Sequence, residues 1–237
     1  MPARAGSKGL PGKNMRLLGD RPLLQYTLEA GLASRRLDRV LLSSDDEGMM
    51  TLARSLGCEV PFRRPAALAA DATSMVDVAL HAVDWLAQES AIDVDALVLL
   101  QPTQPFRTAG DIDAAIDTFE RSGAASLFSV EAVAQHPCEC VSVEDGRLRW
   151  AVEMPAGVTG RQGLPPFYYV NGAIYITSVA FLRAQRSFQD ERTVCHVMSR
   201  TRGLDINDLY DFHVAEGLVR MAADGAPVFD DPREGHA

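Results

Sequence analysis

The 237-residue sequence has only four cysteines, few aromatic residues and no long hydrophobic run. The spacings of Cys58, Cys138, Cys140 and Cys195 match no zinc-binding pattern, so a metal-stabilised fold is not expected. No apolar segment reaches the roughly 18 to 20 residues of a membrane-spanning helix. Nothing at the amino end has the pattern of a signal peptide. We therefore expect a protein of the reducing cytoplasm that folds around its own apolar core.

Positively charged residues are also fewer than negatively charged ones. The chain has 23 lysines and arginines and 32 acidic residues, which gives a net charge of -9. This balance gives no support for binding to nucleic acid or to an anionic membrane surface. An anionic ligand would have to be held by a local group of cations. Hydrophobic residues make up 47% of the chain, and with this length they favour one large α/β domain.

Short apolar runs alternate with amphipathic segments through the first 130 residues. Buried strands are predicted at 39–44, 95–108 and 124–130. Helices are predicted at 47–57, 71–90 and 109–123, where apolar residues recur three and four positions apart. An acid at 45 or 46 is placed to cap the first of these helices, and glycines end the first and third. Such alternation predicts a mostly parallel sheet flanked by helices.

The pattern changes between residues 135 and 166. This segment alternates polar and apolar residues and contains Asp145-Gly146, which is typical of an antiparallel hairpin that leaves the main sheet. A strand at 171–177 and a last helix at 209–225 follow. We predict a single domain over residues 1–225, with 135–166 as its excursion and 226–237 as a C-terminal tail.

The opening loop has the composition of a phosphate-binding loop. Its glycines let the backbone approach a ligand closely, and successive amides can form an anion-binding nest. Four basic residues lie among or just after these glycines: Arg4, Lys8, Lys13 and Arg16. A Pro-rich segment at 100–108 and an acidic segment at 203–209 are expected beside it, since ligands bind at the carboxyl ends of strands in such sheets.

Five motifs occur in a recognisable order: PARAGSKGLPGKN at 2–14, RPAALAADATS at 64–74, LLQPTQPFRTAGDID at 99–113, RQGLPPFYYVNGAIYI at 161–176 and LDIND at 204–208. Together they resemble the acylneuraminate cytidylyltransferases, which include CMP-sialic acid synthetases and bacterial enzymes that activate pseudaminic or legionaminic acid. The resemblance spans residues 1–225. It implies a Rossmann-like nucleotidyltransferase fold, and a reaction of CTP with an acidic nine-carbon sugar that gives CMP-sugar and pyrophosphate, with Mg²⁺ or Mn²⁺.

The same resemblance implies the roles of individual residues. The nucleotide would be bound by Ala3, Arg4, Ser7, Lys8, Lys13, Asn14, Arg64, Ala72 and Ser74. The sugar would be bound by Gln101, Arg161, Gln162, Tyr168 and Asn171. Arg4, Lys8, Lys13 and Gln101 would be catalytic, while Asp205 and Asn207 would hold the metal. A planar guanidinium such as that of Arg161 can take a sugar carboxylate in two parallel bonds. The resemblance also implies a homodimer that packs through 135–166.

Several of these residues have a simpler structural interpretation. The opening loop could be a solvated surface turn, and Gln101 could cap the turn that follows its strand. Asn207 or Asp208 could be the N-cap of the last helix. His136, Cys138 and Cys140 lack the four-ligand spacing of structural zinc, so we expect them to lie on a strand.

The sequence departs from the family pattern at three places. Asn207 stands where a second acid is usual, and hard cations favour carboxylates over amide oxygens. Gly160 stands where an arginine often lies beside Arg161. Met1 stands where the family has a hydrophobic strand that is central to the sheet, so we expect the sheet to lack that strand and a chain extended upstream to be more stable.

Two other functions stay open. One is a cytidylyltransferase for another acidic sugar, such as an eight-carbon ulosonic acid. The other is a protein that binds CTP or CMP-sugar without turnover. A dinucleotide oxidoreductase is disfavoured, because no G-x-G-x-x-G follows a first strand with an acid about 20 residues later.

Overall fold

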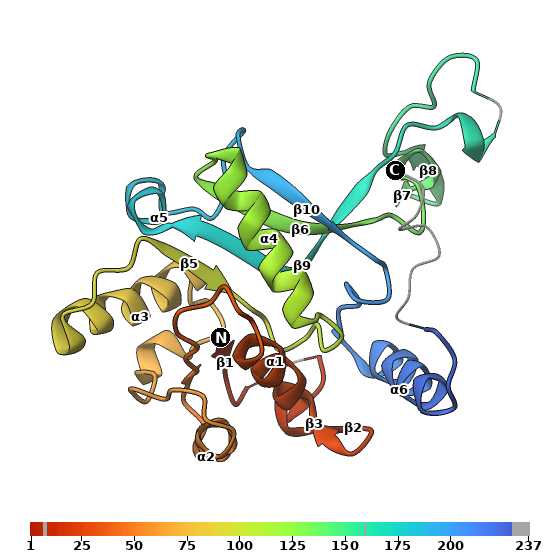
Figure 1. Cartoon of the computed structure of the whole chain (residues 1–237). Coiled ribbons are helices and arrows are strands. Elements are labelled where there is room, and N and C mark those ends of the chain that lie inside the picture. Colours follow the sequence, from red (N-terminus) through yellow and green to blue (C-terminus); the bar gives the residue numbers. More distant parts are fainter. Residues whose placement is uncertain (7–8, 159, 229–237) are drawn as a thin grey trace.

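The computed structural model describes residues 1–6, 9–158 and 160–228 (Figure 1). Its helices are α1 Leu23–Leu32, α2 Glu47–Ser55, α3 Met75–Ser90, α4 Ala109–Ser122, α5 Val179–Gln185 and α6 Leu209–Ala223. Its strands are β1 Pro2–Ala3, β2 Leu17–Leu18, β3 Arg21–Pro22, β4 Ser43–Ser44, β5 Ala96–Leu99, β6 Ser126–Ala132, β7 Val141–Glu144, β8 Arg147–Trp150, β9 Tyr168–Ser178 and β10 Val194–Met198. Short 3₁₀ turns lie at η1 Lys13–Met15, η2 Ala66–Leu68, η3 Pro137–Glu139 and η4 Arg161–Gly163.

The central sheet has the strand order β10-β6-β9-β5. β10 runs parallel to β6, whereas β9 lies antiparallel between β6 and β5. α4 covers one face, where its Ile112 and Ile116 pack with Leu127 of β6 and Ile174 of β9. This arrangement of helices on a mixed sheet confirms the predicted α/β class. The antiparallel β9 is the strand that returns from the excursion, so its direction follows from the connection.

A second, smaller sheet holds the amino end of the chain. β1 pairs in parallel with β4, and the Met1 amine donates to the Leu41 carbonyl at 2.8 Å. The predicted strand at 39–44 is shorter than expected, because only Ser43–Ser44 lies in β4 and Leu41 forms an isolated bridge with Glu59. Leu41 therefore lies between Glu59, with which it forms the bridge, and the Met1 amine, which donates to its carbonyl.

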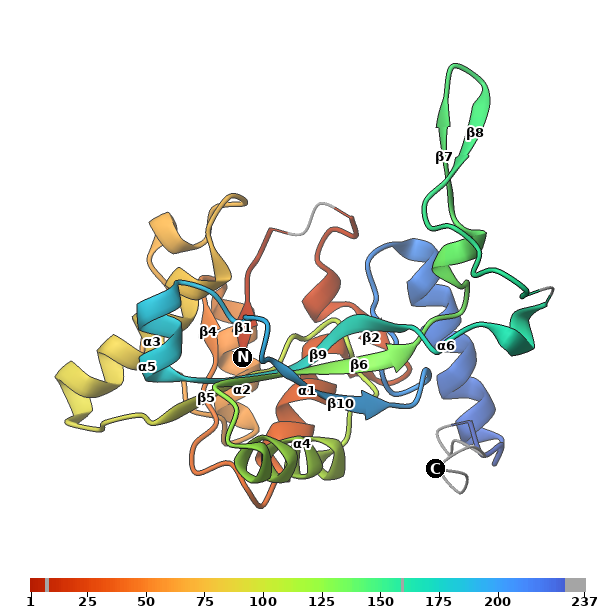
Figure 2. The same cartoon turned by 90° about the horizontal axis from the view of Figure 1, so that it is seen from above.

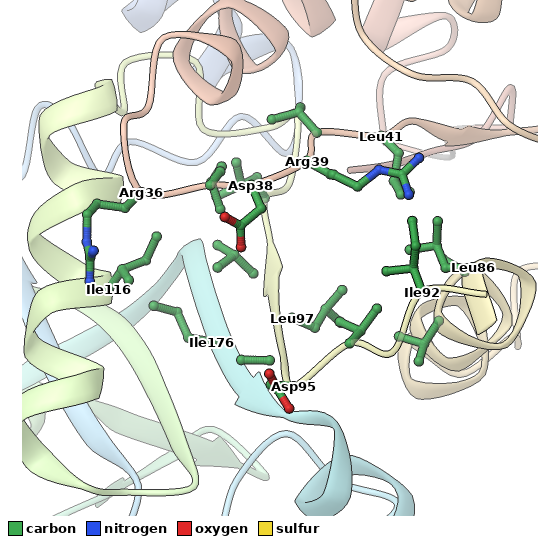
Figure 3. Close-up of a pocket in the computed structure, with 18 of the residues that line it drawn as sticks. Arg36, Asp38, Arg39, Leu41, Leu86, Ile92, Asp95, Leu97, Ile116 and Ile176 are labelled. Atoms are coloured by element: carbon green, nitrogen blue, oxygen red, sulfur yellow. The ribbon is translucent and has the colours of Figure 1, made fainter. Parts of the chain in front are cut away.

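A cavity of about 400 Å³ separates this small sheet from β5. Figure 3 shows Leu86 from α3, Ile116 from α4, Leu97 from β5 and Ile176 from β9 along its walls. Charged residues line it as well, among them Arg36, Asp38 and Asp95, so the cavity is only partly apolar. Met1 and Leu41 line the cavity together with Leu97 of β5, and the stabilising effect of an upstream extension stays a prediction.

The helix ends follow local sequence rules. Asp46 caps α2 by accepting from the Met49 amide at 2.8 Å. Thr108 and Asp111 form a capping box at the start of α4, and Gly123 ends that helix with a φ of 63°. Asp208 and its own capping box begin α6, which decides between the two predicted caps. The helix predicted from residue 71 begins later, because Ser74 is its N-cap.

The predicted hairpin is confirmed as β7 and β8, joined at Asp145 and Gly146 with φ values of 50° and 73°. Figure 2 shows that it extends away from the rest of the chain. One face of the ladder is apolar, and its four side chains are 39 to 70% exposed: Val141, Val143, Leu148 and Trp150. The hairpin therefore presents an uncovered apolar face.

The cysteine cluster before the hairpin differs from its prediction. Cys138 lies in the turn η3 and not on a strand, because the His136 ring accepts from its amide at 3.2 Å and caps that turn. Within the described ranges, no three histidine, cysteine or acidic side chains are grouped so as to hold a metal. No helix there is long and apolar enough to cross a membrane.

Candidate functional site

The opening loop leaves β1 at the edge of the small sheet. Ala3 is buried, and Arg4 follows it with Nη1 at 2.6 Å from Asp71 Oδ1. The next amide, from Ala5, donates to Asp45 Oδ1 at 3.0 Å. Both contacts involve acids that precede helices α2 and α3. The predicted phosphate residue Arg4 is thus placed beside the elements that were predicted to border the base.

The second half of the loop turns back toward Arg4. Gly12, with a φ of 67°, opens the turn η1, and a residue with a side chain would be strained there. Asn14 then donates from Nδ2 to the Arg4 carbonyl at 3.3 Å. Ser7 and Lys8, which were also predicted to hold phosphates, lie outside the described residues.

Lys13 is the best-anchored cation of the loop. Only 9% of the residue is exposed, and Nζ donates to the Ile206 carbonyl at 2.6 Å. Burial lowers the pKa of Lys13, while the nearby charges of Asp205 and Asp211 raise it in part. An ammonium with three donors keeps two for a ligand after this bond.

The acidic segment 205–208 links the opening loop to the Pro-rich turn. The Ile206 amide donates to the Thr103 carbonyl at 2.9 Å, while its carbonyl accepts from Lys13. A Cβ at Gly9 would lie 2.4 Å from the Asn207 carbonyl oxygen, so only glycine permits this approach. Three motifs that are far apart in the sequence therefore meet at one place.

Asp205 and Asn207 lie together at this junction. Asn207 Nδ2 donates to Asp205 Oδ2 at 2.9 Å. The other oxygen, Asp205 Oδ1, is buried and has no hydrogen-bond partner in the part of the chain that the structure describes. A buried carboxylate oxygen without a donor is costly unless a cation or a ligand satisfies it. Asp205 therefore fits the role of a cation ligand, whereas the Asn207 amide presents its nitrogen to Asp205.

The predicted base-binding residues differ in their surroundings. Arg64 is 4% exposed, with Nε donating to Ser43 Oγ at 3.0 Å and Nη2 donating to the Ser43 carbonyl. Burial is the main cause that lowers its pKa. Ala72 and Ser74 are exposed, and the Ser74 hydroxyl accepts from the Val76 amide at 3.2 Å as the cap of α3. Ser74 therefore caps α3 while the residue stays exposed.

Three polar side chains converge at Gly172 of β9, which has a φ of 77°. A Cβ there would lie 3.0 Å from Gln104 Nε2, 3.4 Å from the Tyr175 hydroxyl and 3.5 Å from Gln101 Nε2. Burial raises the pKa of Tyr175, and the charge of Asp205 adds to this effect. The sugar-side residue Gln101 therefore lies close to the junction with the acidic segment.

The side-chain amide of Asn171 already makes hydrogen bonds within the protein. The residue is 2% exposed, and its Oδ1 accepts from Ser129 Oγ at 2.6 Å and from the Ala173 amide at 3.1 Å. Its Nδ2 donates to Glu131 Oε2 at 3.5 Å. The predicted contact between Asn171 and the sugar would require this network to open. Asn171 thus joins β9 to β6 beside Gly172, and its contact with the sugar stays a prediction.

Two further sugar-side residues, Gln162 and Tyr168, are exposed. Gln162 lies in the turn η4, and Tyr168 begins β9 with 48% of its surface exposed. For Arg161, only the backbone in η4 is described. The structure brings Gln101 and Asn171 together around Gly172, whereas Gln162 and Tyr168 lie on the segment that returns from the hairpin.

A cavity of about 590 Å³ adjoins Asp205 and Asn207. Glu131, Tyr169 and Arg200 are among the polar residues that line it. Burial raises the pKa of Glu131, while the Asn171 amide and the charge of Arg200 lower it. The cavity has the size of a small-molecule site.

Sequence reasoning missed Gln104, Arg107, Gly172 and Tyr175 as site residues. All four lie inside the recognised motifs, so the signal was available as residue identity. Gln104 and Arg107 occupy the Pro-rich turn, and both donate to carbonyls of β9 at 2.8 and 2.9 Å. Their role depends on contacts between positions 66 and 67 residues apart, which spacing alone does not reveal.

Comparison with known proteins agrees with this arrangement of motifs. A family model described as cytidylyltransferase matches residues 1–151. The CMP-N,N'-diacetyllegionaminic acid synthase of Legionella pneumophila is 33% identical over 224 residues, which cover 93% of this chain and 95% of that protein. The pseudaminic acid cytidylyltransferase of Campylobacter jejuni is 28% identical over 227 residues, with 95% and 97% coverage.

Longer relatives and solved structures match as well. The N-acylneuraminate cytidylyltransferase of Streptococcus agalactiae is 32% identical over 216 residues, and the match spans 90% of this chain but 50% of that protein. The structure of a CMP:2-keto-3-deoxy-manno-octonic acid synthetase complexed with CTP has a TM-score of 0.66 at 16% identity, and covers 93% of this chain and 97% of that one. That likeness concerns the fold. On the sequence matches, the chain belongs to the cytidylyltransferase family.

Proposed function

We propose that this protein transfers CMP from CTP to the anomeric hydroxyl of a nonulosonic acid and releases pyrophosphate. The observation that carries the proposal is the junction at Ile206, whose amide and carbonyl bind Thr103 and Lys13. This junction joins the phosphate-type loop, the acidic segment and the polar turn in one place. The relatives named for legionaminic, pseudaminic and neuraminic acids support the class of sugar.

The reaction needs little covalent chemistry from the protein. The anomeric oxygen bonds to the α-phosphorus of CTP, the bond from that phosphorus to the bridging oxygen breaks to release pyrophosphate, and the hydroxyl proton passes to solvent. Catalysis is then a matter of positioning and of neutralising the charge on the leaving pyrophosphate. Lys13 suits this task, because it is already ordered by Ile206 and keeps two donors for phosphate oxygens.

Arg4 and Arg64 would serve the nucleotide. Arg4 is only partly exposed and pairs with Asp71, whose carboxylate a phosphate oxygen would replace. Arg64 holds the end of β4 through Ser43, and the base would lie against this backbone. We also keep Ser7 and Lys8 as phosphate ligands on the strength of the resemblance.

Asp205 would be the protein's ligand for Mg²⁺ or Mn²⁺, since its buried Oδ1 has no donor among the described residues. When bound, such a cation supplies further charge neutralisation at the triphosphate. Asn207 would contribute its amide oxygen only after its side chain turns, because its nitrogen faces Asp205 here. We expect a weaker cation site than one built from two carboxylates.

The sugar would lie near Gly172, within reach of Gln101 and the Tyr175 hydroxyl, while the buried Gln104 holds the Asn171 carbonyl beside them. These amide and hydroxyl groups suit a polyhydroxylated ligand. Arg161 would take the sugar carboxylate, as the resemblance implies. Gln162 and Tyr168 would complete the site from the segment that follows the hairpin.

We further propose a homodimer and a cytoplasmic location. The exposed apolar face of the hairpin supports the dimer, because a second copy would cover it. The four cysteines are free thiols, two of them buried, and this state suits a reducing compartment.

The decisive experiment measures pyrophosphate release with CTP, Mg²⁺ and a panel of acidic sugars. The panel contains legionaminic, pseudaminic and neuraminic acids together with an eight-carbon ulosonic acid. We expect release with at least one nine-carbon acid and little with the eight-carbon acid. Preference for the eight-carbon acid would transfer the proposal to that substrate. Tight CTP binding without release from any sugar would make the protein a binding module.

A further inference from the structure

We propose that Arg107 is a positioning residue for the sugar side of the site. This inference rests on the proposed function, since it names a residue that orients groups of that site without touching the substrate. Arg107 lies in the Pro-rich turn between β5 and α4 and is 2% exposed. A buried guanidinium has to find acceptors for its donors, and where these acceptors lie determines what it holds in place.

The guanidinium of Arg107 binds three separate elements. Its Nη1 donates to the Ala173 carbonyl at 2.9 Å and to the Gln101 carbonyl at 3.2 Å. Its Nη2 donates to Thr27 Oγ1 at 2.6 Å and to the Gln101 carbonyl at 3.1 Å. Thr27 belongs to α1, Gln101 follows β5 and Ala173 belongs to β9. One side chain therefore fixes the spacing of three elements.

Two of these acceptors flank the proposed sugar contacts. The Gln101 carbonyl belongs to the residue whose amide nitrogen lies near Gly172, and the Ala173 carbonyl belongs to the residue directly after Gly172. A change in the distance between these carbonyls would move the Gln101 amide relative to the Tyr175 hydroxyl. The contacts of Arg107 thus set the geometry of the polar group around Gly172.

The contacts of Arg107 do not reach the nucleotide side. Lys13 is held by Ile206, and Arg64 is held by Ser43, through bonds that Arg107 does not share. Loss of the Arg107 contacts should consequently affect sugar and CTP differently. A residue that merely stabilises the fold would lower the amount of active enzyme and leave both apparent affinities unchanged.

Lysine cannot replace this arginine. An ammonium carries its donors on one nitrogen, whereas the guanidinium places Nη1 and Nη2 on different acceptors in a rigid plane. Arg107→Lys should keep the charge but release at least one of the three elements. Burial also lowers the pKa of Arg107 to about 9, and the charge of Asp111 offsets this effect in part.

The test is steady-state kinetics of Arg107→Lys with each substrate varied in turn. We expect the KM for the sugar to rise about tenfold or more, because small displacements of a positioned group are costly. The KM for CTP should stay within about twofold of the parent value. Ile116→Ala serves as the matched control, since it removes buried volume from α4 and should lower the melting temperature without changing either KM.

A second variant covers the case in which Arg107→Lys does not fold. Thr27→Val is nearly isosteric and removes the α1 acceptor of Arg107 together with the bond from Thr27 Oγ1 to the Gln101 carbonyl at 3.4 Å, so the sugar KM should rise by about two- to fivefold. Unchanged sugar KM in this variant, or equal rises for sugar and CTP in either variant, would overturn the inference. Failure of the proposed function has a different outcome, because the parent protein would then release no pyrophosphate with any sugar.

Discussion

The nucleotide side and the sugar side of the site differ in how completely the chain orders them. Lys13 and Arg64 are less than a tenth exposed, and each is bound to a backbone carbonyl. Gln162 and Tyr168 are exposed and lie near the base of a hairpin whose apolar face is uncovered. The cations Lys13 and Arg64 of the nucleotide side are thus ordered within the chain, whereas Gln162 and Tyr168 of the sugar side are open to solvent.

This difference follows from what each half would bind. A triphosphate concentrates negative charge, and cations that are already oriented stabilise it without reorganisation at the moment of reaction. A sugar with many hydroxyl groups is recognised by shape and by many weaker contacts. Those contacts would be completed when the ligand binds or when a second copy covers the hairpin. The comparison predicts that mutations on the two sides have different kinetic signatures.

The largest effect is expected from Lys13→Ala on the nucleotide side. Loss of the ammonium should lower kcat by about 100-fold or more, because charge on the leaving pyrophosphate is no longer neutralised. Pyrophosphate release at saturating CTP and sugar measures this effect. Arg16→Ala is the control from the same loop, since Arg16 lies 4.7 Å over the Phe212 ring and should remain near the parent rate. A near-parental rate for Lys13→Ala would remove Lys13 from the reaction.

The hairpin provides the contrasting prediction. Leu148→Glu places a charge on the apolar face that is proposed to pack on a second copy. We expect the molar mass in solution to fall from that of a dimer to that of a monomer, and the sugar KM to rise about fivefold or more. Light scattering and kinetics measure the two effects.

Ser142→Glu is the matched control for the hairpin, because Ser142 lies on its other face, opposite Arg149. It should leave both the molar mass and the sugar KM unchanged. If the parent protein is itself a monomer with an ordinary sugar KM, the sugar side is complete within one chain. The contrast between the two sides would then lose its explanation.

Local rules in the sequence were sufficient for much of the fold. Asp46, Thr108 and Asp208 cap helices because a short oxygen-bearing side chain can accept from the exposed first-turn amides. Asp145-Gly146 gave the hairpin, because both residues adopt the positive φ that its turn requires. These features depend on neighbours a few positions apart, and so a sequence reveals them.

The rest depended on distant contacts. Lys13 bonds to a carbonyl 193 positions away, and no residue pattern encodes a particular carbonyl. Asn171 was predicted to face the sugar by its motif, yet its amide joins Ser129 and Glu131 in the fold. Arg107 was passed over because a motif gives residue identity but not the elements that the side chain joins. Resemblance located the site, and only the structure supplied its internal connections.

The small sheet that supports the nucleotide side gives a prediction of pH dependence. Burial lowers the pKa of the Met1 amine to about 6 from its ordinary value of 8.0. The unfolded chain therefore binds this proton more tightly than the folded one, and stability should rise between pH 6 and pH 8. The full change is about 2 to 3 kcal/mol in the free energy of unfolding for a shift of this size. Denaturant titrations on protein whose Met1 is verified by mass spectrometry measure it.

Five apolar residues appended before Met1 provide the control for this pH dependence. They convert the amine to an amide, and by our expectation they fill the cavity beside β5 as a strand. The melting temperature should rise, and the slope between pH 6.5 and pH 8 should become smaller than in the parent chain. His81 and His196 also have lowered pKa values, but the shorter and longer chains share them, so they cancel in the difference. Identical slopes in the two chains would show that the amine is not the titrating group.

The smallest effect is expected at the cation ligands, where the two sides meet. Asn207→Asp should lower the Mg²⁺ concentration for half-maximal activity by a few-fold, because a carboxylate is the better ligand for a hard cation. The gain is limited, since the new acid loses the bond to Asp205 Oδ2 and repels that carboxylate. Asp205→Asn should raise the Mg²⁺ concentration for half-maximal activity, so the parent value should lie between the values of the two variants. Titrations of pyrophosphate release against Mg²⁺ measure both shifts, and unchanged curves for both variants would place the cation away from this segment.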